Sequence, residues 1–223
     1  MPALARTLAA FAIVIASGLT SPTVHASSQD PAGWYGNLFA GPSNLSSTSL
    51  TETRVPGNSL GDRAEFGSGF GFGGALGYRY GNGWAAEVAW DYRRHSLKKL
   101  GGTTVDGDFA SNTLFLNGYY RFSKWGEIRP FVGAGVGWTQ EIDVDIERNG
   151  RSLSYSRSGA AAVQLMFGGE IDLSNRWSVL ADVRMMRVNA GNLKLEDGVT
   201  GGTITGSPRY RPVSLNLGVT YRF

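Results

Sequence analysis

The sequence predicts an all-β fold: an antiparallel, up-and-down barrel of eight strands that crosses a membrane. Three observations lead to this prediction. Apolar residues recur at every second position in eight segments, short turns alternate with long polar connections, and aromatic residues gather near the segment ends. A period of two gives a strand one apolar and one polar face. In a transmembrane barrel the apolar face contacts lipid and the polar face lines the lumen.

The overall composition agrees with this class of fold and excludes others. Thirty-two glycines and 12% aromatic residues, with only 17% charged residues, fit a β-protein with tight turns and crowded faces. Cysteine is absent, so no disulfide framework is available. The formal net charge is only +3, and the basic residues form no stripe, which argues against nucleic acid as a partner.

The first 26 residues are predicted to be a cleaved signal peptide. Arg6 precedes a short apolar run at residues 8–16, and Val24-His25-Ala26 provides small residues where a signal peptidase cuts. The apolar run is shorter than the roughly 20 residues that a membrane-spanning helix needs. We therefore assign residues 1–26 to the signal peptide and 27–223 to a single barrel domain, with no helix expected after the signal.

The eight strands are predicted, in chain order, at residues 34–41, 66–80, 84–94, 109–122, 128–140, 159–173, 177–189 and 208–223. Their apolar faces carry, strand by strand, Trp34 and Leu38; Phe70 and Phe72; Trp84 and Val88; Leu114 and Leu116; Val132 and Val136; Val163 and Leu165; Val179 and Val183; Leu217 and Val219. The connections are long at 42–65, 95–108, 141–158 and 190–207, and short at 81–83, 123–127 and 174–176. The long connections all fall at one end of such a barrel and the short turns at the other.

The closing strand carries a more specific signal. Asn216, Gly218, Tyr221 and Phe223 follow the pattern polar, any, Gly, two of any, aromatic, any, terminal aromatic. This pattern resembles the motif that closes outer-membrane β-barrel proteins, and the chain resembles the small OmpA/OmpX-like barrels over its whole mature length. Unlike OmpA, the protein is expected to end at the eighth strand, with no periplasmic domain after it.

The resemblance implies location and partners. It places the protein in the cell outer membrane, with periplasmic short turns and four long extracellular loops. It also implies that the barrel assembly machinery reads the closing motif. Outer-membrane lipid and lipopolysaccharide are expected around the barrel, and basic loop residues at its outer rim are predicted to meet lipopolysaccharide phosphates. These residues are Lys98, Lys99, Arg148, Arg151 and Arg157.

The strand alternation predicts a nearly neutral set of charged side chains in the lumen. They are Arg79, Glu87, Asp91, Arg93, Arg121, Arg129, Glu170, Asp172, Asp182, Arg184 and Arg222. An eight-stranded barrel is only wide enough for side chains to fill it, so these charges are expected to pair as a polar plug. Glu87, Glu170, Asp182 and Arg184 are expected in its middle, and Arg79, Arg121 and Arg222 nearer the periplasmic end.

The first functional hypothesis is a structural or surface-interaction barrel that presents its loops to an extracellular ligand that the sequence does not specify. The alternative is a narrow gated channel for ions or small solutes. A lipid-A-modifying enzyme, suggested by His95-Ser96, is disfavoured because adjacent strand residues face opposite ways. Asp143, Asp145 and Glu147 fit a solvated acidic loop better than a calcium site. We predict no enzyme, catalytic residue, metal or cofactor.

Overall fold

A computed structural model describes residues 31–46, 51–54, 58–60, 64–100, 102–148, 151–189, 193–195, 203–205 and 209–223. The predicted signal peptide lies outside these residues. Within the described part of the chain, no helix is long and apolar enough to cross a membrane.

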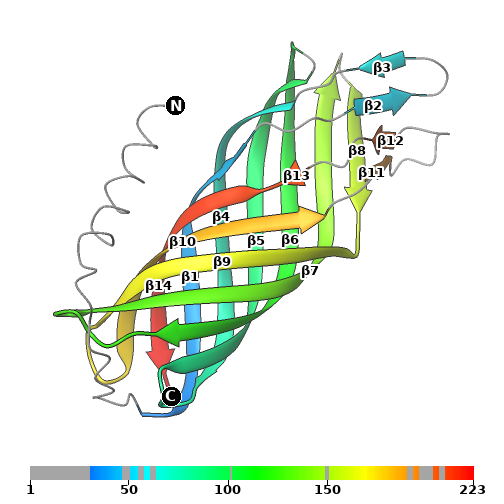
Figure 1. The fold of residues 1–223 in the computed structure, drawn as a ribbon. Helices are drawn as coiled ribbons and strands as arrows, with labels where there is room; N and C mark the ends of the chain where they lie inside the picture. Colours follow the sequence, from blue (N-terminus) through cyan, green and yellow to red (C-terminus); the bar gives the residue numbers. More distant parts are fainter. Residues whose placement is uncertain are drawn as a thin grey trace, which may run out of the picture.

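The barrel consists of β1 (Gly33–Leu45), β4 (Ala64–Arg79), β5 (Trp84–Leu100), β6 (Thr103–Arg121), β7 (Ile128–Arg148), β9 (Ala160–Asp172), β10 (Trp177–Asn189) and β14 (Pro212–Arg222). Neighbouring strands pair in antiparallel fashion, and β14 pairs back onto β1, so the sheet closes on itself. The closed barrel has no free edge. The predicted eight-stranded up-and-down barrel is confirmed (Figure 1).

The short turns join β4 to β5, β6 to β7 and β9 to β10 at the same end of the barrel, as predicted. In the first of them, Gly81 and Gly83 have φ angles of 79° and 87°. L-residues rarely adopt such angles, and a Cβ atom at position 83 would also lie 2.9 Å from the carbonyl oxygen of Arg121. Glycine is therefore required at this turn by both backbone angle and space.

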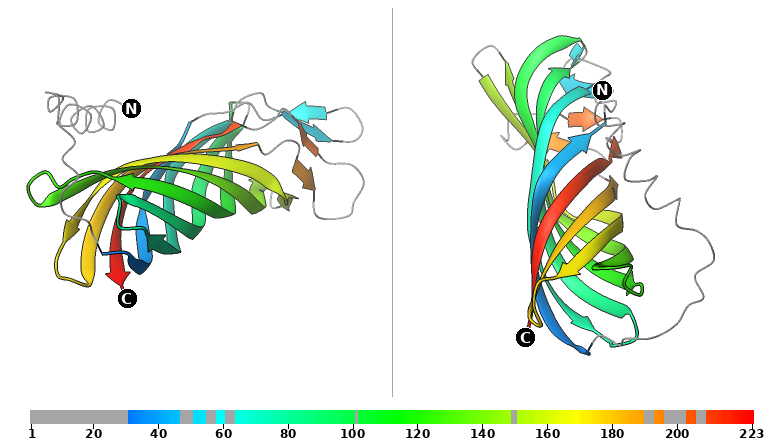
Figure 2. Two further views of the ribbon diagram at one scale, coloured as in Figure 1. Left: turned by 60° about the horizontal axis from the view of Figure 1, so that its bottom comes forward. Right: turned by 90° about the vertical axis from the view of Figure 1, so that its left-hand side faces the viewer.

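The strands continue well beyond the membrane at the opposite end. β5 and β6 remain paired up to Leu100 and Thr103, and β7 pairs with β8 (Arg151–Arg157) up to Arg148. Short strands also lie beyond this end: β2 (Thr51–Arg54), β3 (Asn58–Leu60), β11 (Leu193–Leu195) and β12 (Thr203–Thr205). A further short strand, β13 (Arg209–Tyr210), precedes β14 and pairs with β10 in the barrel wall. Residues 95–108 and 141–158 join the barrel strands at this end, as predicted, but most of their length is paired β-hairpin rather than irregular polar chain (Figures 1 and 2).

The outer surface of the barrel is apolar between two girdles of aromatic side chains. Exposed aromatic residues near the short turns include Trp34, Tyr80, Trp84, Phe122, Trp177 and Phe223, and those nearer the other end include Phe70, Phe72, Trp90 and Trp138. Leu38, Leu76, Leu116 and Leu217 are 53–72% exposed between them. Aromatic girdles that flank an apolar band mark the two interfaces of a membrane.

A testable constraint lies at the seam where β1 meets β14. A Cβ atom on Gly41 would stand 1.9 Å from the carbonyl oxygen of Leu215 and 2.9 Å from the Cα atom of Asn216. Because backbone atoms cannot rotate away, Gly41→Ala is expected to lower the free energy of unfolding by about 1–3 kcal/mol. Urea unfolding in lipid vesicles, followed by tryptophan fluorescence, measures this change.

Gly36 provides the matched control on the same strand. A Cβ atom there would have no neighbour closer than 3.8 Å, so Gly36→Ala should leave the unfolding midpoint nearly unchanged. Equal midpoints for the two variants would contradict the predicted contact at the seam.

Candidate functional site

The barrel interior is the candidate site, and all the charged residues assigned to it face inward. Nine of them are at most 8% exposed: Arg79, Glu87, Asp91, Arg93, Arg121, Arg129, Glu170, Asp182 and Arg184. Asp172 and Arg222 are only partly buried, at 22% and 16% side-chain exposure, and lie at the periplasmic mouth. Ion pairs join many of these residues, but in several groups rather than in one network.

The group just inside the periplasmic mouth is centred on Glu170. Its two carboxylate oxygens accept hydrogen bonds of 2.8 Å from Arg79 and Arg121, and Ser178 donates a further hydrogen bond. Arg129 donates to the carbonyl oxygen of Phe122 at 3.5 Å. Glu170 thus belongs to the periplasmic layer, not to the middle where it was expected.

A second carboxylate, that of Asp172, forms ion pairs at the periplasmic end of the lumen. Asp172 accepts from Arg222 at 2.9 Å and from Lys124 at 2.8 Å. Lys124 comes from the turn between β6 and β7, and its role had no sequence signal because turn residues follow no strand alternation. Solvent screens this partly exposed group, so each of its ion pairs is expected to contribute at most about 1 kcal/mol to stability.

Two Asp-x-Arg sequences form the middle of the lumen. On β5, Arg93 pairs with Asp91 through two hydrogen bonds of 2.7 and 2.8 Å. On β10, Arg184 pairs with Asp182 in the same way, at 2.9 and 3.0 Å. Residues two apart on a strand share a face, so each aspartate is placed beside its own arginine by the sequence itself. Two-point arginine–carboxylate pairs are the strong, geometrically specific ones.

Further contacts connect these two pairs with neighbouring strands. A terminal nitrogen of Arg184 lies 3.9 Å from Asp91, and its guanidinium lies 3.6 Å from the centre of the Phe39 ring. Arg93 donates to the hydroxyl of Ser214 at 2.6 Å, and the amide of Asn216 donates to Asp182 at 2.8 Å. The middle layer therefore ties β1, β5, β10 and β14 together across the lumen.

Glu87 is held differently from the other carboxylates. Its oxygens accept hydrogen bonds from the hydroxyls of Tyr35 and Tyr119, at 2.9 and 2.7 Å, and from the amide of Asn117 at 3.0 Å. These neutral donors were missed from the sequence, although strand alternation places both tyrosines on the inward face. Hydrogen bonds to a carboxylate from neutral donors can compensate for its burial.

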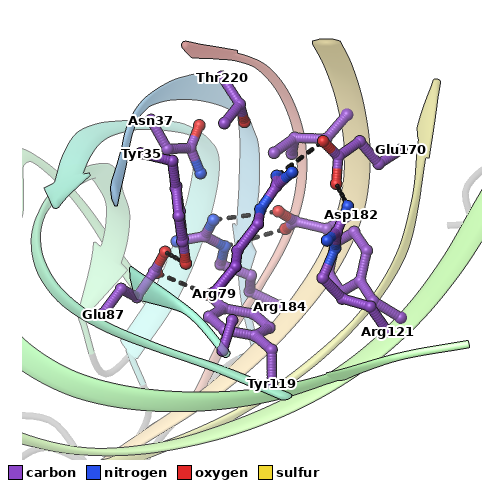
Figure 3. Close-up of a pocket in the computed structure, with 13 residues that line it drawn as sticks. Tyr35, Asn37, Arg79, Glu87, Tyr119, Arg121, Glu170, Asp182, Arg184 and Thr220 are labelled. Carbon is purple, nitrogen blue, oxygen red and sulfur yellow. Dashed lines mark hydrogen bonds and ion pairs between the residues drawn. The ribbon is translucent and has the colours of Figure 1, made fainter. Parts of the chain in front are cut away.

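A small cavity of about 40 Å³ lies among these groups (Figure 3). Its lining includes Arg79, Asn37 and Glu87. The Arg79 side chain has two nitrogens, and Asn37 one oxygen, that are buried without a protein hydrogen-bond partner. A buried water needs at least about 10–15 Å³ of such space, so the cavity has room for about three water molecules. The unpartnered polar atoms of Arg79 and Asn37 favour water in this cavity.

Above the charged groups lies a neutral polar cluster. The Nε2 atom of His95 lies 2.9 Å from the hydroxyl of Ser43, and its Nδ1 atom lies 3.4 Å from the hydroxyl of Tyr210. Tyr210 in turn accepts a 2.9 Å hydrogen bond from Ser111. Ser96 points the other way and donates to the carbonyl oxygen of Ser68. His95 and Ser96 therefore share no site, as their adjacent positions in the strand indicate.

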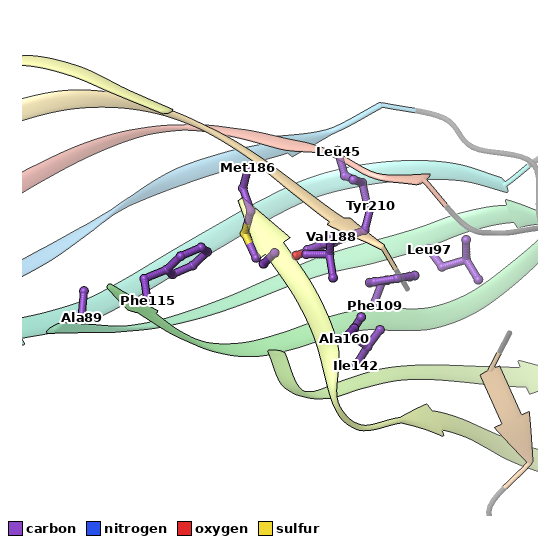
Figure 4. Close-up of a cluster of buried hydrophobic side chains, with 11 residues drawn as sticks. Leu45, Ala89, Leu97, Phe109, Phe115, Ile142, Ala160, Met186, Val188 and Tyr210 are labelled. Atoms are coloured by element: carbon purple, nitrogen blue, oxygen red, sulfur yellow. The ribbon is translucent and has the colours of Figure 1, made fainter. Parts of the chain in front are cut away.

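A cluster of apolar side chains, called the apolar plug below, extends from Ala89 and Phe115 at the level of the charged groups into the extracellular part of the lumen (Figure 4). It consists of Leu45, Ala89, Leu97, Phe109, Phe115, Ile142, Ala160, Ala162, Met186, Val188 and Tyr210, all at most 3% exposed. The ring of Phe109 stacks on Tyr210 with 4.8 Å between centroids. The prediction of a polar lumen was therefore incomplete, because it holds for the membrane-spanning half and not for the outer half.

A β-bulge explains part of this difference. Asn112 pairs with Glu141 while the next residue, Thr113, pairs with Thr139, so β7 carries an extra residue. The bulge shifts the alternation by one position and turns Ile142 into the lumen, where it is fully buried. A bulge leaves no clear mark in the sequence, so alternation alone could not place Ile142.

The residues proposed for the outer rim are only partly described. Lys98 is exposed, and Lys99 lies 3.8 Å from Glu65. The side chains of Arg148, Arg151 and Arg157 lie outside the described set. Within the part of the chain that the structure describes, no group of three or more potential metal ligands comes together.

The closing motif is divided between the two faces of β14. Asn216 is buried in the lumen, and a Cβ atom at Gly218 would lie 2.8 Å from the carbonyl oxygen of Leu38. Tyr221 packs against Trp177, with 4.8 Å between ring centroids. Phe223 is 75% exposed, and its N–H donates to the carbonyl oxygen of Trp34.

Comparison with known proteins agrees with this architecture. The family model described as "Outer membrane protein beta-barrel domain" matches residues 9–223. The chain therefore belongs to this family of outer-membrane β-barrels, and the predicted location in the outer membrane is confirmed.

Two curated relatives match part of the chain at low sequence identity. The outer-membrane protein y4mB of Sinorhizobium fredii is 26% identical over 66% of this chain and 63% of its own length. The dibenzothiophene metabolism operon protein PahQ of Pseudomonas aeruginosa is 28% identical over 47% of this chain and 52% of its own. The chain thus spans just under two thirds of the first relative and about half of the second.

Solved structures resemble the chain in fold. The outer membrane protein AlkL, determined in lipid bilayers, superposes with a TM-score of 0.52 at 17% identity, over 92% of this chain and 97% of that one. Neisserial surface protein A gives a TM-score of 0.49 at 18% identity, over 86% of this chain and 99% of that one. At these identities the likeness concerns the barrel alone.

Proposed function

We propose that this protein is a closed, non-conducting barrel that carries rigid β-hairpins to the cell surface, in a structural or surface-interaction role. The apolar plug in the outer half of the lumen is the observation that carries the proposal. An ion that passed through it would lose its hydration against apolar side chains, because the polar groups at this level already bond to one another: Ser43 with His95, and Ser111 and His95 with Tyr210. The small cavity among the charged groups has a volume of only about 40 Å³.

The length of the outer hairpins supports the surface role. β6 has 19 residues and β7 has 21, whereas about 9–11 residues of a tilted strand cross a bilayer. The two strands stay paired as far as Asp106 and Glu147, so the projecting part is a hydrogen-bonded ladder. A pre-ordered hairpin loses less conformational entropy when it binds a partner than a flexible loop does.

The gated channel is the second candidate. The unpartnered polar atoms of Arg79 and Asn37 at the small cavity favour water inside the lumen. Arg184 lies 3.9 Å from Asp91, so its guanidinium group has a second carboxylate with which it could pair if its ion pair with Asp182 broke. An enzymatic role is not proposed, because the hydroxyl nearest to His95 is that of Ser43, and both side chains are buried.

Single-channel recording in a planar bilayer separates the two candidates. The wild-type barrel, Glu87→Gln and Arg184→Gln are all expected to be silent, because none of them alters the apolar plug. Phe109→Ala with Tyr210→Ala removes the stacked pair from the plug and is expected to produce discrete conductance steps. A heat-dependent shift in gel mobility shows in each case that the barrel is folded.

Steps in the wild-type protein that change size in Glu87→Gln or Arg184→Gln would contradict the closed barrel. They would make the lumen a pathway, with the charged groups as its gate. Silence in the double alanine variant as well would contradict the role assigned to the plug, although the barrel would remain non-conducting.

A further inference from the structure

Two arginines face outward side by side on the extracellular half of the barrel. The pairs Met185–Val213 and Val188–Tyr210 fix the register of this ladder, which sets Arg187 opposite Arg211. Both side chains are exposed. Like charges directly opposite each other on one face of a sheet destabilise it, and no described carboxylate forms an ion pair with either arginine.

The arginine pair lies at the level of the outer membrane interface. Ten residues separate it from the periplasmic aromatic girdle on both strands: Trp177 to Arg187 on β10, and Tyr221 back to Arg211 beside β14. Trp177 and Tyr221 are themselves paired. About 9–11 residues of a tilted strand cross the bilayer, so the two arginines emerge where lipid headgroups begin.

An apolar groove begins at the same two arginines. This open depression of about 1020 Å³ runs from Arg187 and Arg211 along the outer surface of the barrel, and its described lining contains no acidic residue. Near the pair it is bounded by Met185 and Val213. At its far end, the floor of the groove is formed by three cross-strand neighbours with small or no side chains: Ala86, Gly118 and Ala134.

We propose that this groove binds one lipid of the outer leaflet whose headgroup carries phosphate. The phosphate accepts hydrogen bonds from both guanidinium groups, and an acyl chain lies along the groove. Arginine presents several N–H donors in a plane that matches a phosphate, and an anion between the two side chains removes their mutual repulsion. The combination of two cations above an apolar groove thus matches both ends of an anionic lipid.

A second groove on the barrel provides an internal comparison. It has a volume of about 720 Å³ and is also apolar, with Leu38, Ala181 and Leu217 among its lining. No charged residue is described in that lining. An ordinary acyl chain can lie against either surface, but only the groove below Arg187 and Arg211 offers a partner for phosphate.

The test measures lipid A that remains bound to the purified, folded full-length barrel in a neutral detergent, by native mass spectrometry. Bis-phosphorylated lipid A is compared with the same lipid after enzymatic removal of its phosphates. Arg187→Gln with Arg211→Gln is expected to weaken binding of the phosphorylated lipid by about tenfold or more. Arg187→Lys with Arg211→Lys keeps the charge and should recover part of the affinity.

Lys124→Gln with Arg176→Gln is the matched control, because it removes the same charge from exposed residues of the short turns, at the opposite end of the barrel. This variant should bind like the wild type, and equal weakening in both double variants would overturn the proposal in favour of a net-charge effect. Equal binding of the phosphate-free lipid to the wild-type barrel would also overturn it, and this comparison needs no variant to fold. Inorganic phosphate should compete weakly, because it lacks the acyl chain; full competition at low concentration would refute a lipid site.

Discussion

Glu170→Gln is expected to lower the free energy of unfolding by about 3–5 kcal/mol. Glu170 is 5% exposed and is bonded to both Arg79 and Arg121. Glutamine has nearly the same shape but no charge, so the substitution removes the buried negative charge that Arg79 and Arg121 share. Urea unfolding in lipid vesicles, followed by tryptophan fluorescence and by gel mobility, measures the change.

Glu127→Gln is the control for this prediction. Glu127 is exposed in the turn between β6 and β7, so removing its charge should change the unfolding free energy by less than about 0.5 kcal/mol. The difference between the two variants isolates the effect of burial. A loss below about 1 kcal/mol at Glu170 would contradict the central role assigned to it in the periplasmic layer.

Phe223→Ala is expected to reduce assembly of the barrel in cells while leaving the stability of the refolded protein nearly unchanged. The side chain is 75% exposed, so its removal should barely change unfolding of the refolded barrel. If the assembly machinery buries this ring, its loss removes about 1.5–3 kcal/mol of binding, which is at least about tenfold in affinity. The amount of heat-modifiable protein in outer membranes should therefore fall, while refolding into vesicles is preserved.

Phe122→Ala is the matched control, because Phe122 is also an exposed aromatic residue of the periplasmic girdle, at 45% exposure. It lies outside the closing strand, so the same substitution there should leave assembly in cells near the wild-type level. Equal losses for both variants would mean that the girdle, and not the closing motif, determines insertion. Loss of refolding in vitro for Phe223→Ala would contradict the expected result.

The strand alternation was a reliable guide to the membrane-spanning half of the lumen. Asp91 and Arg93, like Asp182 and Arg184, lie two residues apart on one strand, and the structure joins both pairs. Their direction and their pairing both follow from a local period of two. The same period also directs Tyr35 and Tyr119 into the lumen, where their hydroxyls donate hydrogen bonds to Glu87.

The extracellular half was misread because the alternation reverses there. Outside the membrane, the outer face meets water and carries residues such as Arg94 and Lys98, while Leu97 and Phe109 turn inward and are buried. In the membrane, the outward face of each strand is apolar because it contacts lipid. Beyond the membrane, the outward face is polar because it contacts water, and the inward face is apolar. One hydrophobic pattern therefore does not describe the whole strand. The change of surroundings, and not the end of the strand, produced the polar segments that suggested loops.

The sequence by itself determined the number of strands, the end that carries the short turns, and the face on which each membrane-spanning residue lies, because these follow from a local repeat. Only the tertiary structure decided that Glu170 joins Arg79 and Arg121, 91 and 49 residues away along the chain. The tertiary structure also decided that a bulge turns Ile142 into an apolar plug. Partner choice across a barrel depends on register, and register is a property of pairs of strands rather than of either strand alone.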